Sequence, residues 1–224
     1  MKVLIFDSGT LITLSMNNLL DMLRDLKKIF PGKFIITKEV ENEIVLRPLR
    51  IQQFKLGAIR LRKLIQDKIL EFPDVLNIRH SAVSNTANEL LKEANSIFIA
   101  DGNPVHIVDQ GEASILALNK LLQNRGIKSM IAIDERTTRM LCERPENLRK
   151  LLENKLHTRV KQQKQISKDF HKASFIRSTE LIYVAYKKGI VPKDKELLDA
   201  MLYGAKFKGA SISSDEINEI ERMA

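Results

Sequence analysis

Four acidic residues that are far apart along the chain occur where apolar sequence gives way to polar sequence. Asp7 and Asp134 each follow a run of four apolar residues. Glu43 and Glu112 lie within, or at the start of, expected helices. Carboxylates that are forced together repel one another and raise each other's pKa, and a divalent cation relieves that repulsion. Oxygen ligands of this kind suit Mg²⁺ or Mn²⁺, which can activate water and stabilise the leaving oxygen of a phosphodiester.

Each of these acids also has a purely structural interpretation. Asp7 could be a turn residue at the end of a strand, and Asp134 could be the N-cap of the helix that follows it. Glu112 could simply complement the dipole of its helix. Glu43 could be a solvated helix residue, since two other glutamates of the same segment compete for its role. Capping and dipole effects would explain single acids, but they do not explain why similar junctions recur along the chain.

The apolar pattern predicts the elements that position these acids. Short apolar runs at 2–6, 34–36 and 129–133 are typical of buried strands in a parallel sheet. Helical periods lie between these runs, and one of them predicts a helix over 109–124. Alternating strands and helices favour an α/β fold with a parallel sheet and right-handed crossovers. The functional crevice of such a sheet lies at the carboxyl ends of its strands, where the acids could converge.

Length, charge and cysteine content limit the class of protein. The 224 residues can bury a real core, and the net charge of +9 suits a polyanionic partner such as nucleic acid. The same charge is also common in proteins that bind no nucleic acid. The single cysteine, Cys142, excludes an internal disulfide and a cysteine-based zinc site. Because no apolar run is long enough to span a membrane and the opening run is too short and acidic for a signal peptide, we expect a cytoplasmic protein.

Two basic segments, 47–63 and 155–172, could supply contacts to phosphate groups. The first reads as a basic amphipathic helix or helix pair, and the second as a hinge or solvated helix. The alternative is that both are ordinary solvated faces. Beyond Pro145 only helices are expected. The isolated histidines are not expected to take part in catalysis: His80, His106, His157 and His171.

Several of these motifs together resemble the PIN domain of metal-dependent ribonucleases. The opening strand leads into Asp7-Ser8, and residues 40–43 are similar to the V-x-x-E of that family. Residues 109–113 are similar to its GEA signature. Residues 131–136 are similar to its strand-D-[DE]-R ending. The four motifs occur in the order and with the spacing that the family shows, and this makes their combination more specific than any one of them.

The resemblance covers roughly residues 1–142, and it implies a fold and an activity. The implied fold is a Rossmann-like three-layer α/β/α domain with a parallel sheet. We expect this domain over 1–145, with a helical insertion at about 47–103 that short toxin members lack. An all-α extension is expected over 146–224, where the last helices look like the tail of a prokaryotic subgroup of PIN-domain proteins. The implied activity is endonucleolytic cleavage of RNA with Mg²⁺ or Mn²⁺ as cofactor.

The resemblance also implies roles for individual residues. The catalytic and metal-binding acids would be Asp7, Glu43, Glu112 and Asp134. Three polar residues would lie beside this pocket rather than form it: Ser8, Asp109 and Glu135. Two arginines could hold an RNA phosphate, with solvated side chains as the alternative: Arg136 and Arg139.

The leading hypothesis is therefore a metal-dependent endoribonuclease, either a toxin-type protein or an RNA-processing enzyme. Its partner would be RNA, and a small antitoxin protein and a second copy of the chain in a homodimer are further candidates. No membrane partner is expected. A non-catalytic RNA-binding or assembly module that keeps the PIN fold is the main alternative. A structure-specific DNA nuclease of related fold ranks last, because the sequence lacks the second acidic cluster expected for it.

Overall fold

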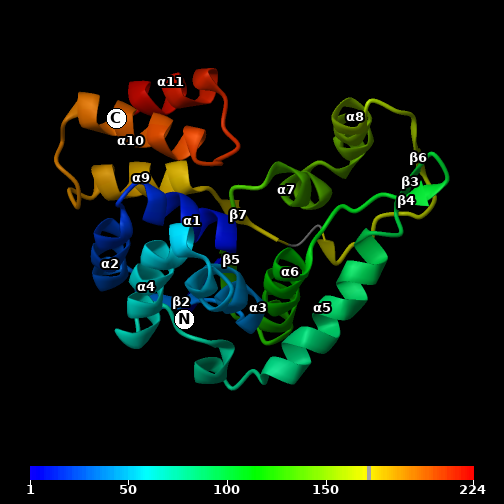
Figure 1. The fold of residues 1–224 in the computed structure, drawn as a ribbon, viewed down its shortest axis with the longest axis horizontal. Helices are drawn as coiled ribbons and strands as arrows, with labels where there is room; N and C mark the ends of the chain where they lie inside the picture. Colours follow the sequence, from blue (N-terminus) through cyan, green and yellow to red (C-terminus); the bar gives the residue numbers. More distant parts are fainter. Residues whose placement is uncertain (171–172) are drawn as a thin grey trace.

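A four-stranded parallel sheet forms the centre of the molecule (Figure 1). The structure is a computed structural model, and it describes residues 1–170 and 173–224. The strands of the sheet lie in the order β2-β1-β5-β7. They are β1 (Lys2–Phe6), β2 (Gly32–Ile35), β5 (Lys128–Ala132) and β7 (Phe175–Ile176). The predicted α/β fold with a parallel sheet is confirmed.

Strand β1 has a neighbour on each side, which explains its continuous apolar sequence. Lys2 is in register with Gly32 of β2 and with Lys128 of β5. The side chains of Ile5 and Phe6 are fully buried because helices cover the sheet around them. The first three predicted strands therefore lie where the apolar runs placed them, with ends that differ by one or two residues.

Helices connect the strands in the first half of the chain, with short turns between some of them. Side-chain caps fix the starts of two of these helices: Thr37 Oγ1 accepts a hydrogen bond from the N–H of Val40 in α3, and α6 begins with a capping box. The helical elements are α1 (Ser8–Met16), α2 (Leu20–Ile29), α3 (Lys38–Glu41), the π-helical turn η1 (Asn42–Leu46), the 3₁₀ turns η2 (Pro48–Arg50) and η3 (Pro73–Leu76), α4 (Gln52–Gln66), α5 (His80–Ala94) and α6 (Gln110–Asn124).

The expectation that only helices follow Pro145 is wrong. Strand β7 pairs with β5, so the last part of the chain completes the same parallel sheet that contains β1. Strand β6 (Val160–Gln162) joins a separate antiparallel sheet with β3 (Phe98–Ala100) and β4 (Asn103–Pro104). The described part of the second basic segment, residues 155–170, is consequently not a solvated helix. The helices of this half are α7 (Arg136–Glu143), α8 (Pro145–Leu156), α9 (Ser178–Lys187), α10 (Lys195–Phe207) and α11 (Ser214–Arg222).

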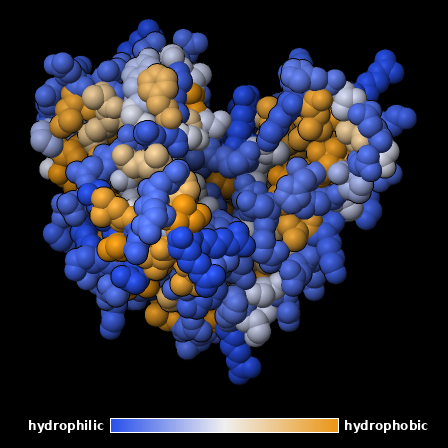
Figure 2. All heavy atoms as spheres, viewed as in Figure 1, coloured by the Kyte–Doolittle hydropathy of each residue, from blue (hydrophilic) through white to orange (hydrophobic). Residues whose placement is uncertain are grey.

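The basic segment 47–63 lies mainly on α4, and its charged side chains are exposed. Apolar side chains of the same helix are also exposed, including Phe54 and Leu56, so this surface is mixed in character (Figure 2). In the second basic segment, Lys172 lies outside the described residues, as does His171 among the histidines. Among the described residues, no helix has the length and apolar character needed to cross a membrane.

Candidate active site

The carboxyl ends of β1 and β5 meet at the point where the order of strands reverses. From β1 the chain adds β2 on one side of the sheet, and it later adds β5 and β7 on the other side. Ligand sites of parallel α/β sheets lie outside the strand ends at such a point. Asp7 directly follows β1, and its backbone N–H donates to Ala132 O of β5 at 2.9 Å. Asp134 follows β5, so both aspartates lie at the same edge of the sheet, as predicted.

Asp7 is buried at this edge of the sheet. The residue is only 5% exposed, and its Oδ2 accepts a hydrogen bond from the N–H of Gly9 at 3.0 Å. Burial raises the pKa of Asp7 to about 7, and the negative charges of Asp109 and Glu43 add to this rise. Asp7 does cap α1, but a capping role alone favours an exposed carboxylate and does not account for neighbouring acids.

Glu43 reaches the same place from the π-helical turn η1. In this turn the N–H of Arg47 donates to Asn42 O at 2.9 Å, five residues back, and such turns are frequent at functional sites. The competing glutamates are engaged elsewhere: Glu39 accepts a hydrogen bond from the Ser84 hydroxyl at 2.9 Å. Glu41 pairs with Lys38 at 2.9 Å. Glu43 is therefore the glutamate of this segment that faces the other acids.

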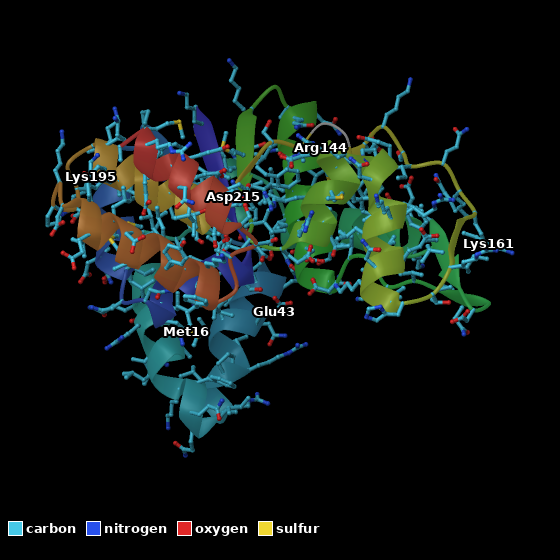
Figure 3. The ribbon with its side chains drawn as sticks, turned by 90° about the horizontal axis from the view of Figure 1, so that it is seen from above. Met16, Glu43, Arg144, Lys161, Lys195 and Asp215 are labelled. Carbon is cyan, nitrogen blue, oxygen red and sulfur yellow. The ribbon has the colours of Figure 1, made fainter. Side chains whose placement is uncertain are left out.

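The carboxylate of Glu43 lies directly against the first turn of α6. A Cβ atom on Gly111 would lie 2.7 Å from Glu43 Oε1 and 2.8 Å from Oε2, so only glycine leaves room for this contact. Figure 3 shows Glu43 on the part of the chain that approaches α6. Burial raises the pKa of Glu43, with the charge of Asp109 adding to the rise, whereas the Ser8 hydroxyl and Arg47 oppose it. The Ser8 hydroxyl therefore lies beside Glu43, and its place beside a metal pocket stays a prediction.

Glu112 and Asp109 hold each other at the start of α6. Glu112 Oε2 accepts a hydrogen bond from the N–H of Asp109 at 2.9 Å, and Asp109 Oδ1 accepts one from the N–H of Glu112 at 2.8 Å. Burial raises the pKa of Glu112 to about 8, and the charges of Asp109, Glu135 and Asp7 add to the rise. The charge of Asp109 thus acts on all three of Asp7, Glu43 and Glu112, which is a larger role than its sequence suggested. The sequence signal that could have indicated this role of Asp109 is the D-x-x-E spacing of residues 109–112, which is typical of a capping box.

Asp134 has a different environment from the other three acids. It is not the N-cap of α7, because Glu135 takes that position and accepts a hydrogen bond from the N–H of Thr138 at 2.6 Å. Asp134 Oδ1 instead accepts a hydrogen bond from the N–H of Ser178, at the start of α9, at 2.8 Å. Burial raises the pKa of Asp134, while Ser178 and the positive charge of Arg139 oppose the rise. The structure thus ties Asp134 to the C-terminal helices, a contact that the sequence did not reveal.

The two candidate phosphate-binding arginines lie on α7. Arg139 donates to Glu135 O at 3.4 Å and to Ser211 O at 3.3 Å. Arg136 is exposed. Both side chains line a cleft between α7 and the C-terminal helices. Neither makes a hydrogen bond to Asp7, Glu43 or Glu112 within the described part of the chain.

The side chains at this edge suit a hard divalent cation in their chemistry. All the donors are carboxylate oxygens, and they destabilise one another when ionised. Within residues 1–170 and 173–224, however, no group of three or more acidic, histidine or cysteine side chains is spaced to hold one metal ion. The donor set therefore fits an ion that is held by one or two carboxylates and completed by water and a substrate phosphate, as is common for Mg²⁺. The four-acid metal site stays a prediction.

Comparisons of the chain with protein-family models, with curated proteins and with solved structures gave no match. Three acids come together at the candidate site from three separate segments of the chain, the buried Asp7 and Glu112 and the partly exposed Glu43.

Proposed function

We propose that the protein is a metal-dependent endoribonuclease that cleaves RNA phosphodiester bonds at the site formed by Asp7, Glu43 and Glu112. The observation that supports this proposal most is the convergence of these three acids, two of them buried and all with raised pKa values, at the point where the strand order reverses. Such a cluster destabilises the protein without a ligand, and perturbed carboxyl groups of this kind are concentrated at functional sites. The parallel sheet also supports a Rossmann-like three-layer α/β/α organisation of the PIN type.

In this proposal Asp7, with Glu43 or Glu112, would hold Mg²⁺ or Mn²⁺. The bound ion would stabilise the charge that develops on the phosphate oxygens. The chain's own residues orient these carboxylates: the Ser8 hydroxyl contacts Glu43, and the capping box fixes Glu112. Burial excludes bulk water from most of the site, which strengthens each electrostatic interaction within it. Asp134 is included in the proposed site because it follows β5 at the sheet edge where Asp7 follows β1.

RNA is the proposed substrate because the protein is basic and its cationic side chains are exposed along α4. The proposal leaves two roles open, a toxin with a small antitoxin partner and an RNA-processing enzyme. It also includes assembly as a homodimer and a cytoplasmic location. The choice between toxin and processing enzyme depends on which RNA is cut and on what the protein binds.

A cleavage assay tests the proposed activity directly. We expect the purified protein to cut a mixed RNA at internal positions when Mg²⁺ or Mn²⁺ is present, to leave DNA intact, and to be inactive with a chelator. If the protein cut DNA but not RNA, the substrate would be DNA. A protein that binds RNA but cuts neither nucleic acid with any metal would favour the non-catalytic RNA-binding module.

Gly111→Ala is expected to reduce cleavage with little effect on folding. The new methyl group would displace the Glu43 carboxylate, which is the flexible end of a side chain and can move at small energetic cost. Displacing a catalytic group by about 1 Å can reduce the rate by roughly a hundredfold, so we expect a loss of about tenfold to a hundredfold. Cleavage rate and thermal unfolding temperature, measured on the same preparation, check this prediction.

Gly57→Ala is the matched control for this variant. Gly57 lies within α4, and a Cβ atom there would meet Ser15 Oγ at 3.6 Å, an ordinary contact. Alanine is favoured over glycine within a helix by about 1 kcal/mol, so this variant should be slightly more stable and fully active. Equal cleavage by the Gly111 and Gly57 variants would show that the contact between Glu43 and Gly111 has no role in catalysis.

A further inference from the structure

A polar cleft of about 840 Å³ lies between α7 and the C-terminal helices, apart from the acid cluster. Its walls come from α7 and Arg144, from the start of α9, and from the stretch that runs from the end of α10 to the start of α11. Figure 2 shows the surface hollowed between these parts of the molecule, with hydrophilic residues around the notch. In Figure 3, Arg144 and Asp215 lie on the two sides of this region. The proposed cleavage reaction does not use this cleft.

Two guanidinium groups converge on one backbone oxygen at the cleft. Arg139 Nη2 donates to Ser211 O at 3.3 Å, and Arg177 Nη1 donates to the same oxygen at 3.4 Å. The Arg177 side chain is only 11% exposed, so its charge is poorly screened by water. The positive charges therefore repel each other, and both burial and Arg177 lower the pKa of Arg139. A negatively charged ligand would relieve this repulsion.

The carboxylates at the cleft do not neutralise its arginines evenly. Arg177 takes two of them, with Glu180 Oε1 at 2.8 Å from its Nη2 and Glu216 Oε1 at 2.7 Å from its Nη1. Within the described part of the chain, the hydrogen bonds of Arg139 go to the backbone oxygens of Glu135 and Ser211.

Arg136 and Arg144 also line the cleft, and among the described residues they have no ion pair and no side-chain hydrogen bond. Of the glutamates that line the cleft, Glu143 is the one that is not paired with Arg177. Lys206 also lines the cleft and donates to the Ser214 hydroxyl, so among the described residues three arginines and this lysine face the single glutamate and give the cleft a surplus of positive charge.

We propose that this cleft binds a phosphate group through Arg136, Arg139 and Arg144. The guanidinium group presents paired N–H donors in a planar fork that matches two oxygens of a phosphate. The cleft also lies beyond the carboxyl ends of β5 and β7, where parallel sheets place their ligands. The N–H of Ser211 donates to Asp134 O at 3.2 Å, so the wall of the cleft is attached to the edge that holds the acids.

The phosphate could belong to an RNA backbone or to a free phosphate compound, and binding measurements distinguish these sources. The probes are a labelled oligouridylate, inorganic phosphate, uridine monophosphate and uridine, each in the presence of a chelator so that binding is measured without cleavage. The test variant is Arg136→Gln with Arg144→Gln, since neither side chain has an ion pair or hydrogen bond with residues 1–170 and 173–224. The control variant carries Arg149→Gln with Lys150→Gln, which removes the same charge from the exposed face of α8, outside the cleft.

We expect the test variant to bind phosphate-bearing probes at least roughly tenfold more weakly than the wild type, while the control variant changes affinity by less than about threefold. Weaker binding of inorganic phosphate and uridine monophosphate would identify a free phosphate compound as the ligand, and weaker binding of the oligouridylate alone would identify the RNA backbone. Arg139→Gln should give a similar loss, provided that its unfolding temperature shows that it folds. Equal affinities of the test and control variants for every probe, or no binding of any phosphate-bearing probe by the wild type, would overturn the proposal.

Discussion

Asp7→Asn is expected to reduce RNA cleavage by about a hundredfold or more. The amide keeps the size of the side chain and can still accept the hydrogen bond from the N–H of Gly9, so the start of α1 should be preserved. The change removes the negative charge that would hold the cation, and the developing charge of the transition state then lacks its counter-ion. RNA binding should persist or become tighter, because a negative charge near the phosphates has been removed. Initial cleavage rates and RNA affinity, measured in parallel, separate these effects.

Asp74→Asn is the matched control for this experiment. Asp74 is exposed, far from β1 in sequence, and its side chain makes no hydrogen bond or ion pair with the described residues. This variant should cleave RNA as the wild type does. Full activity of Asp7→Asn would end the metal-nuclease proposal. A normally folded Asp7→Asn protein that binds RNA but does not cleave it would support the proposal.

The parts of the fold that could be predicted from the sequence are those in which the pattern of apolar residues along the chain matches the burial of the element that they form. Strand β1 is apolar because it is covered on both faces, and the start of α6 carries its own capping box. Strand β7 could not be predicted in the same way, because only Phe175 and Ile176 form it and their extended conformation depends on pairing with β5. Strand β6 likewise depends on β3, which is about sixty residues away.

The candidate site shows the same division between local and distant determinants. Asp7 and Glu112 could be placed because strand ends and helix starts are marked in the sequence. The position of Glu43 depends on a π-helical turn and on the space left by Gly111, neither of which has a periodic signal. The contact between Asp134 and Ser178 joins residues 44 positions apart, and nothing in the local sequence of either one indicates it. Distant contacts of this kind decide how the acids are oriented once the strands have placed them.

The metal-free protein is expected to lose stability as the pH rises from about 5 to about 8. Burial and neighbouring acids raise the pKa of Asp7 to about 7 and that of Glu112 to about 8, whereas in the unfolded chain both groups titrate near 4. Between these values the folded protein holds protons that the unfolded chain has released, so the free energy of unfolding falls with pH. The contribution of these groups is fully present below about pH 4 and is lost as the pH passes through 7 and 8.

Urea unfolding at pH 5 and pH 8, in the presence of a chelator, measures this loss, which should amount to a few kcal/mol. Glu112→Gln is the informative variant, because the amide oxygen can still accept the hydrogen bond from the N–H of Asp109 but cannot ionise. Its free energy of unfolding should fall less between the two pH values than that of the wild type. Added Mg²⁺ should stabilise the wild type more at pH 8 than at pH 5, because the cation binds the ionised carboxylates. If wild type and Glu112→Gln lost the same stability over this range, the buried carboxyl of Glu112 would not be protonated in the folded state, and the electrostatic basis of the proposed site would be wrong.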